Sequence, residues 1–413
     1  MVEMARWILR NNDRGGYTVP ARGLYPFQWL WDSGFTALGW ATFDPERAWL
    51  ELRTLFRGQW LNGFLPHIVF HSEDPGYFPG PEIWGVDHQP QTTGLTQPPF
   101  LAPVVLHLLQ RDPDRPRALR EARYLYPRLL ALHTFLHRYR DPEGTGLVGV
   151  LHPWETGMDN SPAWDVPLAR VPEGPLPPFQ RRDLVHVPGE QRPREEDYRR
   201  YLYLVLAYRS RGYDPETCYR EAPFLVADIG FNAILLYADE ALARLAEILG
   251  EESKQPLAWL HRGLAAIEAL WNEKAGLYHS LDLRLGVPIP QDTSAGFLPL
   301  LLPLPRPRVL KMRKALGRFA QGTTYLLPSV PPHDPAFEPR RYWRGPVWPP
   351  VNYLLALGLR RHGLLDEASQ LEADFVALVE QAGFREYFNP LTGEGLGGKE
   401  FSWTAALYLA LLD

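Results

Sequence analysis

Apolar residues recur at steps of three and four along most of the chain, which is the spacing of one buried face of an α-helix. The clearest run covers residues 232–249 and stops before Gly250, a residue type that commonly closes helices. Its apolar face consists of Leu235, Ala238, Leu242, Leu245 and Leu249. Residues 365–383 repeat the pattern with Ala368, Leu371, Phe375, Leu378 and Val379. Both segments are therefore predicted to be helices packed against a core.

Similar periodicity predicts helices in much of the remaining chain. They are expected at residues 2–11, 33–42, 45–60, 98–110, 118–139, 195–209, 255–272, 295–302, 307–321, 347–361 and 401–412. Alternating patterns typical of strands are scarce and short, as at residues 147–151. The chain is therefore predicted to be all-α, with roughly a dozen helices or a few more.

The connections between these helices alternate between short and long. Tight turns are expected at residues 43–44 and 362–363. Long loops rich in Gly, Pro and aromatic residues cover residues 12–31, 61–97, 140–163, 171–194, 273–294, 322–346 and 384–400. This alternation predicts a toroid of helical hairpins, an (α/α)6 barrel, whose long loops gather at one end and form a site on a rigid scaffold.

A superhelical repeat array is the alternative architecture for so many helices. Such an array shows self-similarity at a fixed period, and the sequence has no such repeat. No linker-like break in composition occurs either. Residues 1–413 are therefore expected to form a single domain.

The proline content requires an explanation. Prolines number 42 in 413 residues, which is about twice ordinary usage, and a surplus of this kind is typical of disordered chains. Hydrophobic residues at 45% and aromatics at 13% exclude disorder, because a chain of this length and apolarity buries a large core. The prolines are therefore expected in ordered loops and at helix starts.

Charge and cysteine content exclude several classes of protein. The formal net charge of −5 comes from 43 basic and 48 acidic residues, without the basic stripe of a nucleic-acid-binding protein. Cys218 is the only cysteine, so neither an intramolecular disulfide nor a cysteine-based zinc site is expected. Only five of the basic residues are Lys, and the resulting arginine bias fits a GC-rich genome such as that of a thermophile.

The chain carries no targeting signal that the sequence reveals. Residues 1–16 lack the order of a signal peptide, and no run of about 18 apolar residues predicts a membrane span. We therefore expect a cytoplasmic protein with no membrane and no nucleic-acid partner. The sequence leaves open whether the chain forms a homo-oligomer.

Four long loops combine Trp and Tyr with carboxylates, around residues 25–34, 154–165, 341–348 and 385–404. Aromatic planes stack on the apolar faces of sugar rings and convergent polar groups bind hydroxyls, so these loops predict a pocket for a small polar ligand. Two carboxylates across such a pocket can cleave a glycosidic bond, one protonating the leaving oxygen and the other activating water. Asp159 and Glu386 are the best candidates, because aromatic neighbours in sequence would desolvate each carboxyl.

Each candidate also has a plainer interpretation. Asp159 precedes Asn-Ser-Pro, a context typical of a turn or an N-cap, and Asp32 lies where a helix start is expected. Glu386 can be a solvated loop carboxylate, and single Trp residues are more often core than ligand platform. His67 and His71 raise the question of a metal site, together with His88, but their Pro- and Gly-rich surroundings disfavour the helix that would pair them. No metal and no cofactor is therefore expected.

Four motifs follow one another along the chain: Trp31-Asp32-Ser33-Gly34, Glu155-Thr156-Gly157-Met158-Asp159-Asn160-Ser161-Pro162, Tyr342-Trp343-Arg344-Gly345-Pro346-Val347-Trp348 and Glu386-Tyr387-Phe388-Asn389-Pro390. As a set they resemble glycoside hydrolase family 63 and its relatives the trehalases, which are inverting α-glycosidases on (α/α)6 barrels. The resemblance implies Asp159 as the general acid and Glu386 as the general base. Thr156 stands where Ser is usual, and Glu386-Tyr387-Phe388 departs from the usual Glu-x-Tyr spacing.

Within that family, the chain lacks the additional β-rich domain of the processing α-glucosidases and is similar to the bacterial mannosylglycerate and glucosylglycerate hydrolases. The resemblance implies that the sugar is surrounded by Trp31, Asp32, Trp154, Gly157 and Trp348. It implies that the glycerate is held by Tyr25, Trp29, Tyr77, Gln97, Arg192, Tyr342 and Trp343, with Leu30 in the same binding segment and Arg199 as the alternative to Arg192. An Arg suits this role because its planar fork binds a carboxylate through two parallel hydrogen bonds. The loops at 61–97 and 171–194 are expected to act as lids.

Other functions stay open at this point. A trehalase or another small α-glucosidase shares the motifs, whereas a non-catalytic carbohydrate-binding protein would keep the aromatics without needing both carboxylates. A terpene-cyclase-like enzyme would need an Asp-rich metal motif, which the sequence lacks. The sequence does not decide between mannose and glucose, which differ only in the orientation of the C2 hydroxyl.

Overall fold

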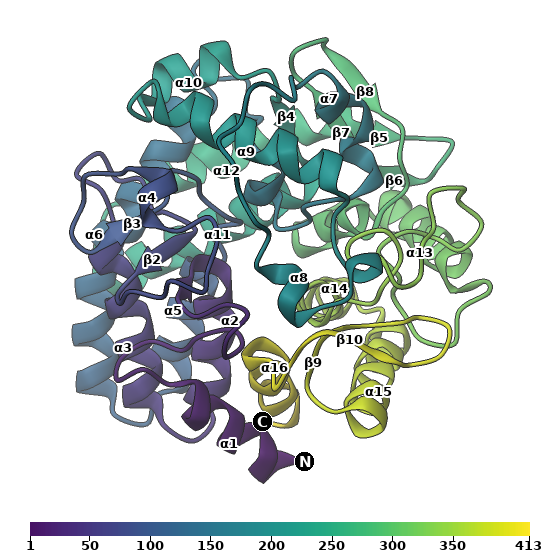
Figure 1. Cartoon of the computed structure of the whole chain (residues 1–413). Helices are drawn as coiled ribbons and strands as arrows, with labels where there is room; N and C mark the ends of the chain where they lie inside the picture. The colour runs from purple at the N-terminus through teal and green to yellow at the C-terminus, as the bar shows by residue number, and fades with distance from the viewer.

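The computed structural model describes all residues, 1–413, and its helices form two concentric layers (Figure 1). The inner layer consists of α2 (Leu30–Ala41), α5 (Leu101–Arg111), α11 (Ile229–Leu249), the 3₁₀ segment η6 (Ser294–Leu301), α14 (Pro349–Arg361) and α16 (Ser402–Leu412). Each inner segment contacts the next in this order, and α16 contacts α2 again, so the six close a ring. The predicted all-α (α/α)6 barrel is confirmed.

The outer layer pairs one helix with each inner segment. Its members are α3 (Pro45–Leu55), α6 (Arg115–Tyr139), α12 (Lys254–Ala266), α13 (Arg306–Ala320), α15 (Leu365–Ala382) and α1 (Val2–Asn12). Five pairs are consecutive hairpins, and α13 reaches η6 through Phe319 and Phe297, whose ring centroids lie 5.0 Å apart. The sixth pair joins the two ends of the chain, because α1 packs on α16. The termini accordingly lie close together in Figure 1.

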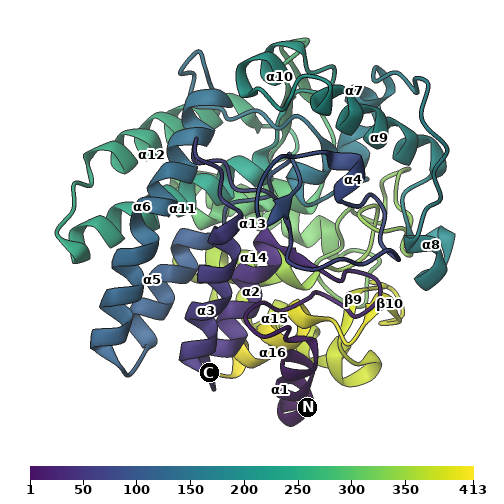
Figure 2. The ribbon, with the colours of Figure 1, turned by 60° about the vertical axis from the view of Figure 1, so that its left-hand side comes forward.

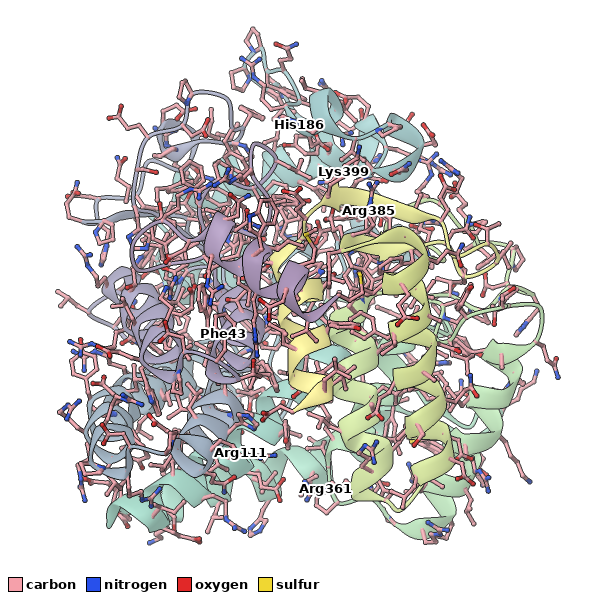
Figure 3. All side chains as sticks on the ribbon, turned by 90° about the horizontal axis from the view of Figure 1, so that it is seen from below. Phe43, Arg111, His186, Arg361, Arg385 and Lys399 are labelled. Atoms are coloured by element: carbon pink, nitrogen blue, oxygen red, sulfur yellow. The ribbon has the colours of Figure 1, made fainter.

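Every inner segment begins after a long loop, and every one except α16, which ends the chain, leads into a short turn. The short turns therefore lie at one end of the barrel and the long loops at the other. In Figure 3, Arg111 and Arg361, which end α5 and α14, lie on the side opposite His186 and Lys399, which belong to long loops. The amino ends of the inner helices, where a helix dipole is positive, consequently all point toward the loop end.

Short secondary structure organises the long loops. The four small sheets are antiparallel: β1 (Gln28–Trp29), β2 (Ile68–Phe70) and β3 (Gln91–Thr92); β4 (Val226–Ala227), β7 (Ser280–Asp282) and β8 (Val287–Ile289); β5 (Trp271–Asn272) with β6 (Leu277–Tyr278); and β9 (Arg385–Phe388) with β10 (Gly395–Lys399). Helical elements in the loops are η1 (Phe56–Gly58), α4 (Pro81–Trp84), η2 (Pro153–Thr156), η3 (Pro162–Trp164), α7 (Asp165–Ala169), α8 (Asp183–His186), η4 (Gly189–Gln191), α9 (Glu195–Arg209), α10 (Pro215–Glu221) and η5 (Ile267–Leu270). Figure 2 shows α8 standing away from the barrel helices, on the side where β9 and β10 lie.

Several predicted elements differ from the observed ones. The helix expected at 33–42 starts at Leu30, because the chain enters it from β1 and the Leu30 amide donates to the His67 carbonyl at 2.9 Å. Asp32 therefore lies inside the first helical turn, and its interpretation as an N-cap is wrong. The segment expected at 295–302 is a 3₁₀ helix containing Pro299, whose missing N–H disfavours a regular α-helix. The strand expected at 147–151 is reduced to a single bridge between Val150 and Val226.

Two predicted helices are too long. The helix at 45–60 ends at Leu55 and continues only as η1, and the helix at 255–272 ends at Ala266 and leads into η5 and β5. The short elements α4, α7, α8 and α10 were not predicted, because four to seven residues carry too little periodicity. No helix has the length and apolarity needed to span a bilayer.

Candidate active site

A cavity opens at the loop end of the barrel. Its empty volume is about 990 Å³ including the mouth. It is lined by 29 residues, which include members of every long-loop region but one. That size and the mixture of aromatic with polar groups are typical of a site for a small organic ligand. The cavity lies at the amino ends of α2 and α16 and beside β9.

Asp159 lies in a turn between η2 and η3, on the cavity wall. Its carboxyl is half-buried and receives a hydrogen bond only from its own backbone amide. Burial raises the pKa of Asp159 to about 7, against the opposing field of Arg192. Ser161, not Asp159, caps η3, because its side chain accepts from the Ala163 amide. The capping interpretation of Asp159 is therefore wrong, and its carboxyl is free to face a ligand.

The turn bearing Asp159 is tied to the structure on both sides. Glu155 accepts two hydrogen bonds of 2.8 Å from Arg140 and one each from the Thr96 and Leu151 amides. Gly157 has φ +72° and lies against the Trp31 ring, where an added Cβ would come within 2.7 Å of the ring, so only glycine fits.

On the other side, Asn160 accepts from the Trp343 amide at 2.9 Å, and Arg344 forms a bidentate pair with Asp165 at 2.8 and 2.9 Å. Such bidentate contacts fix geometry as well as adding energy. The position of Asp159 is therefore set by buried contacts and not by the turn alone.

Glu386 reaches the cavity from β9, and its side chain is 1% exposed. Tyr25 donates to Oε1 at 3.0 Å, the Gly398 amide donates to Oε2 at 2.9 Å, and Arg192 Nη1 lies 3.5 Å from Oε1. Burial raises the pKa of Glu386, while Arg192, Gly398 and Tyr25 oppose the rise by favouring the ionised form. The interpretation of Glu386 as a solvated loop carboxylate is wrong.

Asp32 is a third buried carboxylate in the same cavity. It lies in the first turn of α2 and is 4% exposed. Burial raises its pKa well above the ordinary value, and the neighbouring charge of Glu386 adds to the effect. Its carboxyl receives a hydrogen bond only from its own amide. Like the Asp159 carboxyl, the Asp32 carboxyl therefore has hydrogen-bonding positions that a ligand can occupy.

Arg192 is the buried cation of the cavity. Its guanidinium lies 4.4 Å from the Tyr342 ring centroid and 5.7 Å from that of Tyr25, and Nε donates to Asp183 at 3.2 Å. Nη1 is buried without a hydrogen-bond partner, which is costly unless a ligand supplies an acceptor. Arg199, the alternative, does not line the cavity.

Half of the Trp residues belong to the cavity, where they form an aromatic wall. Seven of the 14 Trp residues line the cavity: Trp29, Trp31, Trp84, Trp154, Trp343, Trp348 and Trp403. The rings of Trp343 and Trp348 are stacked 3.8 Å apart, and Tyr387 stacks on the other side of Trp348 at 4.4 Å. This stack stiffens the wall between Tyr342 and β9.

The structure brings nearly all the candidate residues together. Lining the cavity are Tyr25, Trp29, Trp31, Asp32, Tyr77, Gln97, Trp154, Gly157, Asp159, Arg192, Tyr342, Trp343, Trp348 and Glu386. Leu30 is the exception, because its side chain is buried in the core. Lining residues that were not proposed include His67, Trp84, Arg182, Asp183, His186, Tyr198 and Trp403. Their local sequence carries no signal of a site, except that His67 stood out as a histidine and belongs to no cluster able to hold a metal.

Comparison with known proteins places the chain in a family of glycoside hydrolases. Residues 25–404 match the family model of the mannosylglycerate hydrolase MGH1-like glycoside hydrolase domain. A mannosylglycerate hydrolase from Thermus thermophilus is 54% identical over 97% of this chain and 98% of its own, and a glucosylglycerate hydrolase from Mycolicibacterium hassiacum is 37% identical over 98% of this chain and 96% of its own. A crystal structure of a family 63 mannosylglycerate hydrolase from Thermus thermophilus with Tris and D-glycerate, 54% identical, superimposes with a TM-score of 0.98 over 100% of this chain and 99% of its own.

Proposed function

This chain belongs to the mannosylglycerate hydrolase MGH1-like glycoside hydrolases, and we propose on that basis that it hydrolyses 2-O-α-mannosylglycerate, 2-O-α-glucosylglycerate or both. The products are the free sugar and glycerate, and the anomeric centre inverts. The observation that carries the proposal is the unequal treatment of two buried carboxylates in one cavity. The protein leaves the Asp159 carboxyl without outside donors, while it gives Glu386 two hydrogen-bond donors and the nearby guanidinium of Arg192.

This inequality assigns the two roles. A carboxyl with a pKa of about 7 is still about half protonated at neutral pH, which suits a general acid, so Asp159 protonates the glycosidic oxygen as glycerate leaves. Donors from Tyr25 and Gly398, with the nearby Arg192, favour ionised Glu386, which takes a proton from the attacking water. Pairs of carboxyls whose environments push their pKa values apart commonly divide the work in this way.

Inversion requires a water molecule between Glu386 and the sugar, on the face opposite the leaving glycerate. The carboxyls of inverting pairs lie about 6.5–9.5 Å apart, which leaves room for this water. Positive charge develops on the sugar ring in the transition state, and we assign the neighbouring Asp32 to holding the sugar and orienting the water.

Recognition of glycerate rests on Arg192. Its unpartnered Nη1 supplies a donor that a carboxylate would satisfy, and Tyr25, Trp29, Tyr77, Gln97, Tyr342 and Trp343 complete this part of the cavity. The sugar would occupy the part lined by Trp31, Asp32, Trp154, Gly157 and Trp348. The loops at 61–97 and 171–194, which contribute Tyr77 and Arg192, would close over the bound substrate and exclude water.

A substrate panel tests this function. It contains mannosylglycerate, glucosylglycerate, mannosylglucosylglycerate, trehalose and kojibiose, and NMR identifies the anomer released first. Hydrolysis of a glycerate glycoside with β-sugar appearing first is the expected result. Activity on trehalose alone would favour a trehalase, and binding without turnover would favour a carbohydrate-binding protein.

A pair of variants tests the glycerate site. Arg192→Met is expected to raise KM for the glycerate glycosides by about 100-fold, since it removes a charge-assisted contact and leaves Tyr25 and Tyr342 without their cation. Arg199→Met is the matched control, because Arg199 lies on the neighbouring helix outside the cavity. Equal KM values for the two variants would contradict the role of Arg192.

A further inference from the structure

Two buried histidines lie against Trp154, and the protein treats them differently. The His152 ring centroid is 4.6 Å from that of Trp154, and the His67 centroid is 6.3 Å away. His152 Nδ1 accepts from the Trp154 amide at 2.9 Å, and Nε2 donates to the Tyr201 carbonyl at 3.1 Å. Both nitrogens of His152 are thus used by the fold, and His152 does not line the cavity.

His67 uses only one of its ring nitrogens. Nδ1 lies 3.1 Å from the Leu95 carbonyl oxygen and 2.7 Å from Thr93 Oγ1, whereas Nε2 has no partner in the protein. His67 lines the cavity, with its ring held between those of Trp84 and Trp154. The unused nitrogen therefore belongs to the part of the ring that faces the ligand space.

The contacts of Nδ1 determine the chemistry of Nε2. Nδ1 either donates to the Leu95 carbonyl oxygen, which can only accept, or accepts from the Thr93 hydroxyl, and the first arrangement leaves a lone pair on Nε2. Burial lowers the pKa of His67 to about 3, so the ring stays neutral across the working range of an enzyme. A neutral imidazole of this tautomer offers the ligand a hydrogen-bond acceptor and nothing else.

We propose that His67 is a sugar-binding residue in the tautomer protonated at Nδ1, so that Nε2 accepts a hydrogen bond from one hydroxyl of the sugar. The backbone places it on the sugar side of the cavity, because the His67 carbonyl accepts from Leu30, next to Trp31. A carboxylate such as that of glycerate would not bind there, since two acceptors would face each other. The inference rests on the proposed function for the identity of the sugar.

The acceptor assignment also predicts selectivity. A site that hydrogen-bonds a hydroxyl discriminates against an analogue lacking it, because the buried partner is left unpaired. The carboxyls of Asp159 and Asp32 are protonated when their raised pKa values exceed the pH, and they then offer donors to the sugar. His67 supplies an acceptor for a hydroxyl proton on the same sugar.

The test combines a variant with a series of modified sugars. Kinetic constants for the glycerate glycoside and its 2-, 3-, 4- and 6-deoxy analogues are measured for the parent, His67→Phe and His67→Gln. In the parent, removal of the hydroxyl at one position of the sugar is expected to lower kcat/KM about 10-fold. In His67→Phe the penalty at that position should fall to about one, while the penalties at the other positions stay unchanged.

Deoxyfluoro analogues separate acceptor from donor. Fluorine cannot donate a hydrogen bond. At the contacted position, the ratio of kcat/KM for the parent to kcat/KM for His67→Phe should therefore fall equally for the fluoro and the deoxy sugar. The electronic effect of fluorine on the reaction cancels in this ratio, because both enzymes meet the same substrate. Recovery of activity with the fluoro sugar would show that Nε2 donates and would overturn the assignment.

His152→Phe is the matched control, since it removes two hydrogen bonds beside the same Trp154 without touching the cavity. It should lower stability and leave the pattern across deoxy sugars intact. Binding of free mannose, glucose and their deoxy analogues, measured by calorimetry, repeats the test without hydrolysis, so the proposed function and the role of His67 can fail separately. Identical deoxy patterns for the parent and His67→Phe in either assay would overturn the inference.

Discussion

Carboxylates occur both in the barrel wall and in the cavity, and two of those in the cavity lack the donors that the carboxylates of the wall receive. In the wall, Glu51 accepts hydrogen bonds from Thr18, Gln28, Ser33 and Arg47, and Asp239 is paired with His133 at 2.7 Å and His137 at 2.9 Å. In the cavity, Asp159 and Asp32 receive hydrogen bonds only from their own amides. Asp32 is buried like the carboxylates of the wall and Asp159 is half-buried, so the main difference between the two regions is in the hydrogen-bond donors.

The consequence is opposite in sign for the two regions. Hydrogen bonds and the charges of His137 and His133 hold the pKa of Asp239 below its ordinary value in spite of burial, whereas burial raises the pKa of Asp159 to about 7. A buried carboxyl that the fold surrounds with donors is part of the scaffold. One that the fold leaves without donors, beside a cavity, has its hydrogen-bonding capacity available for chemistry. The two regions can therefore be distinguished by substitution.

The largest effect is expected from Asp159→Asn. The amide cannot protonate the leaving oxygen, so kcat should fall by about 10²–10⁴-fold while the fold is retained. Steady-state kinetics with mannosylglycerate and a circular dichroism spectrum measure both. Asp366→Asn, an exposed carboxylate in the first turn of α15, is the control and should stay at parental activity. Activity within tenfold of the parent for Asp159→Asn would place Asp159 with the scaffold carboxylates.

The matching substitution in the wall is Asp239→Asn. It replaces one of the two acceptor oxygens by an NH2 group, so either His133 or His137 loses its acceptor, and breaking a buried pair of this kind costs about 3 kcal/mol or more. Urea denaturation should show this loss, while kcat at a temperature where the variant is folded should be unchanged. A variant of parental stability and reduced kcat would reverse the distinction between the regions.

The pH dependence of kcat/KM sharpens the comparison within the cavity. Activity needs Asp159 protonated, so the rate should fall above about pH 7, tenfold per pH unit at the limit. It also needs Glu386 ionised, so the acidic limb should lie above the ordinary pKa of a glutamate. A plateau extending to pH 9 would show that Asp159 does not act as the acid.

The smallest effect concerns stability. The folded-state pKa of Asp159 exceeds the ordinary value of 3.8, so the folded protein binds this proton more tightly than the unfolded chain and its stability declines as pH rises from about 4 to about 7. Asp159→Asn removes this loss and should be more stable than the parent by about 1–3 kcal/mol at pH 8, with no difference at pH 4. Asp239 acts in the opposite sense: its stabilisation is present above pH 4 and is lost as pH falls through its lowered pKa. Equal stability of Asp159→Asn and the parent at pH 8 would contradict the raised pKa.

The scaffold was predictable because its information is local. A helix that buries one face repeats apolar residues every three or four positions, which is why α9 was predicted to the residue and α11 and α15 within a few. The predictions failed where tertiary contacts decide. The start of α2 depends on the partner of the Leu30 amide, which lies 37 residues away at His67.

The site was predictable only where a motif marks it. Asp159, Glu386 and most of the aromatic wall lie in four recognisable segments, and their convergence follows from the barrel, whose inner segments all begin at one end. His67, Tyr198 and Asp183 reach the same cavity from stretches with no such marking. Leu30 was included as part of the segment Trp29-Leu30-Trp31-Asp32 on which the family resemblance rests, yet its side chain is buried in the core. Which nitrogen of His67 is free depends on contacts that only three-dimensional structure provides.

The division of labour between Asp159 and Glu386 is tested most directly by changing the leaving group. Fluoride departs without a proton, so α-mannosyl fluoride, or the glucosyl analogue, bypasses the general acid and still requires the base. We expect Asp159→Asn to hydrolyse the fluoride at a rate within about tenfold of the parent, while its rate on the glycerate glycoside falls by about 10²–10⁴-fold. Glu386→Gln is expected to lose activity on both substrates. Equal losses on both substrates for Asp159→Asn, or a fluoride rate retained by Glu386→Gln, would contradict this division of labour.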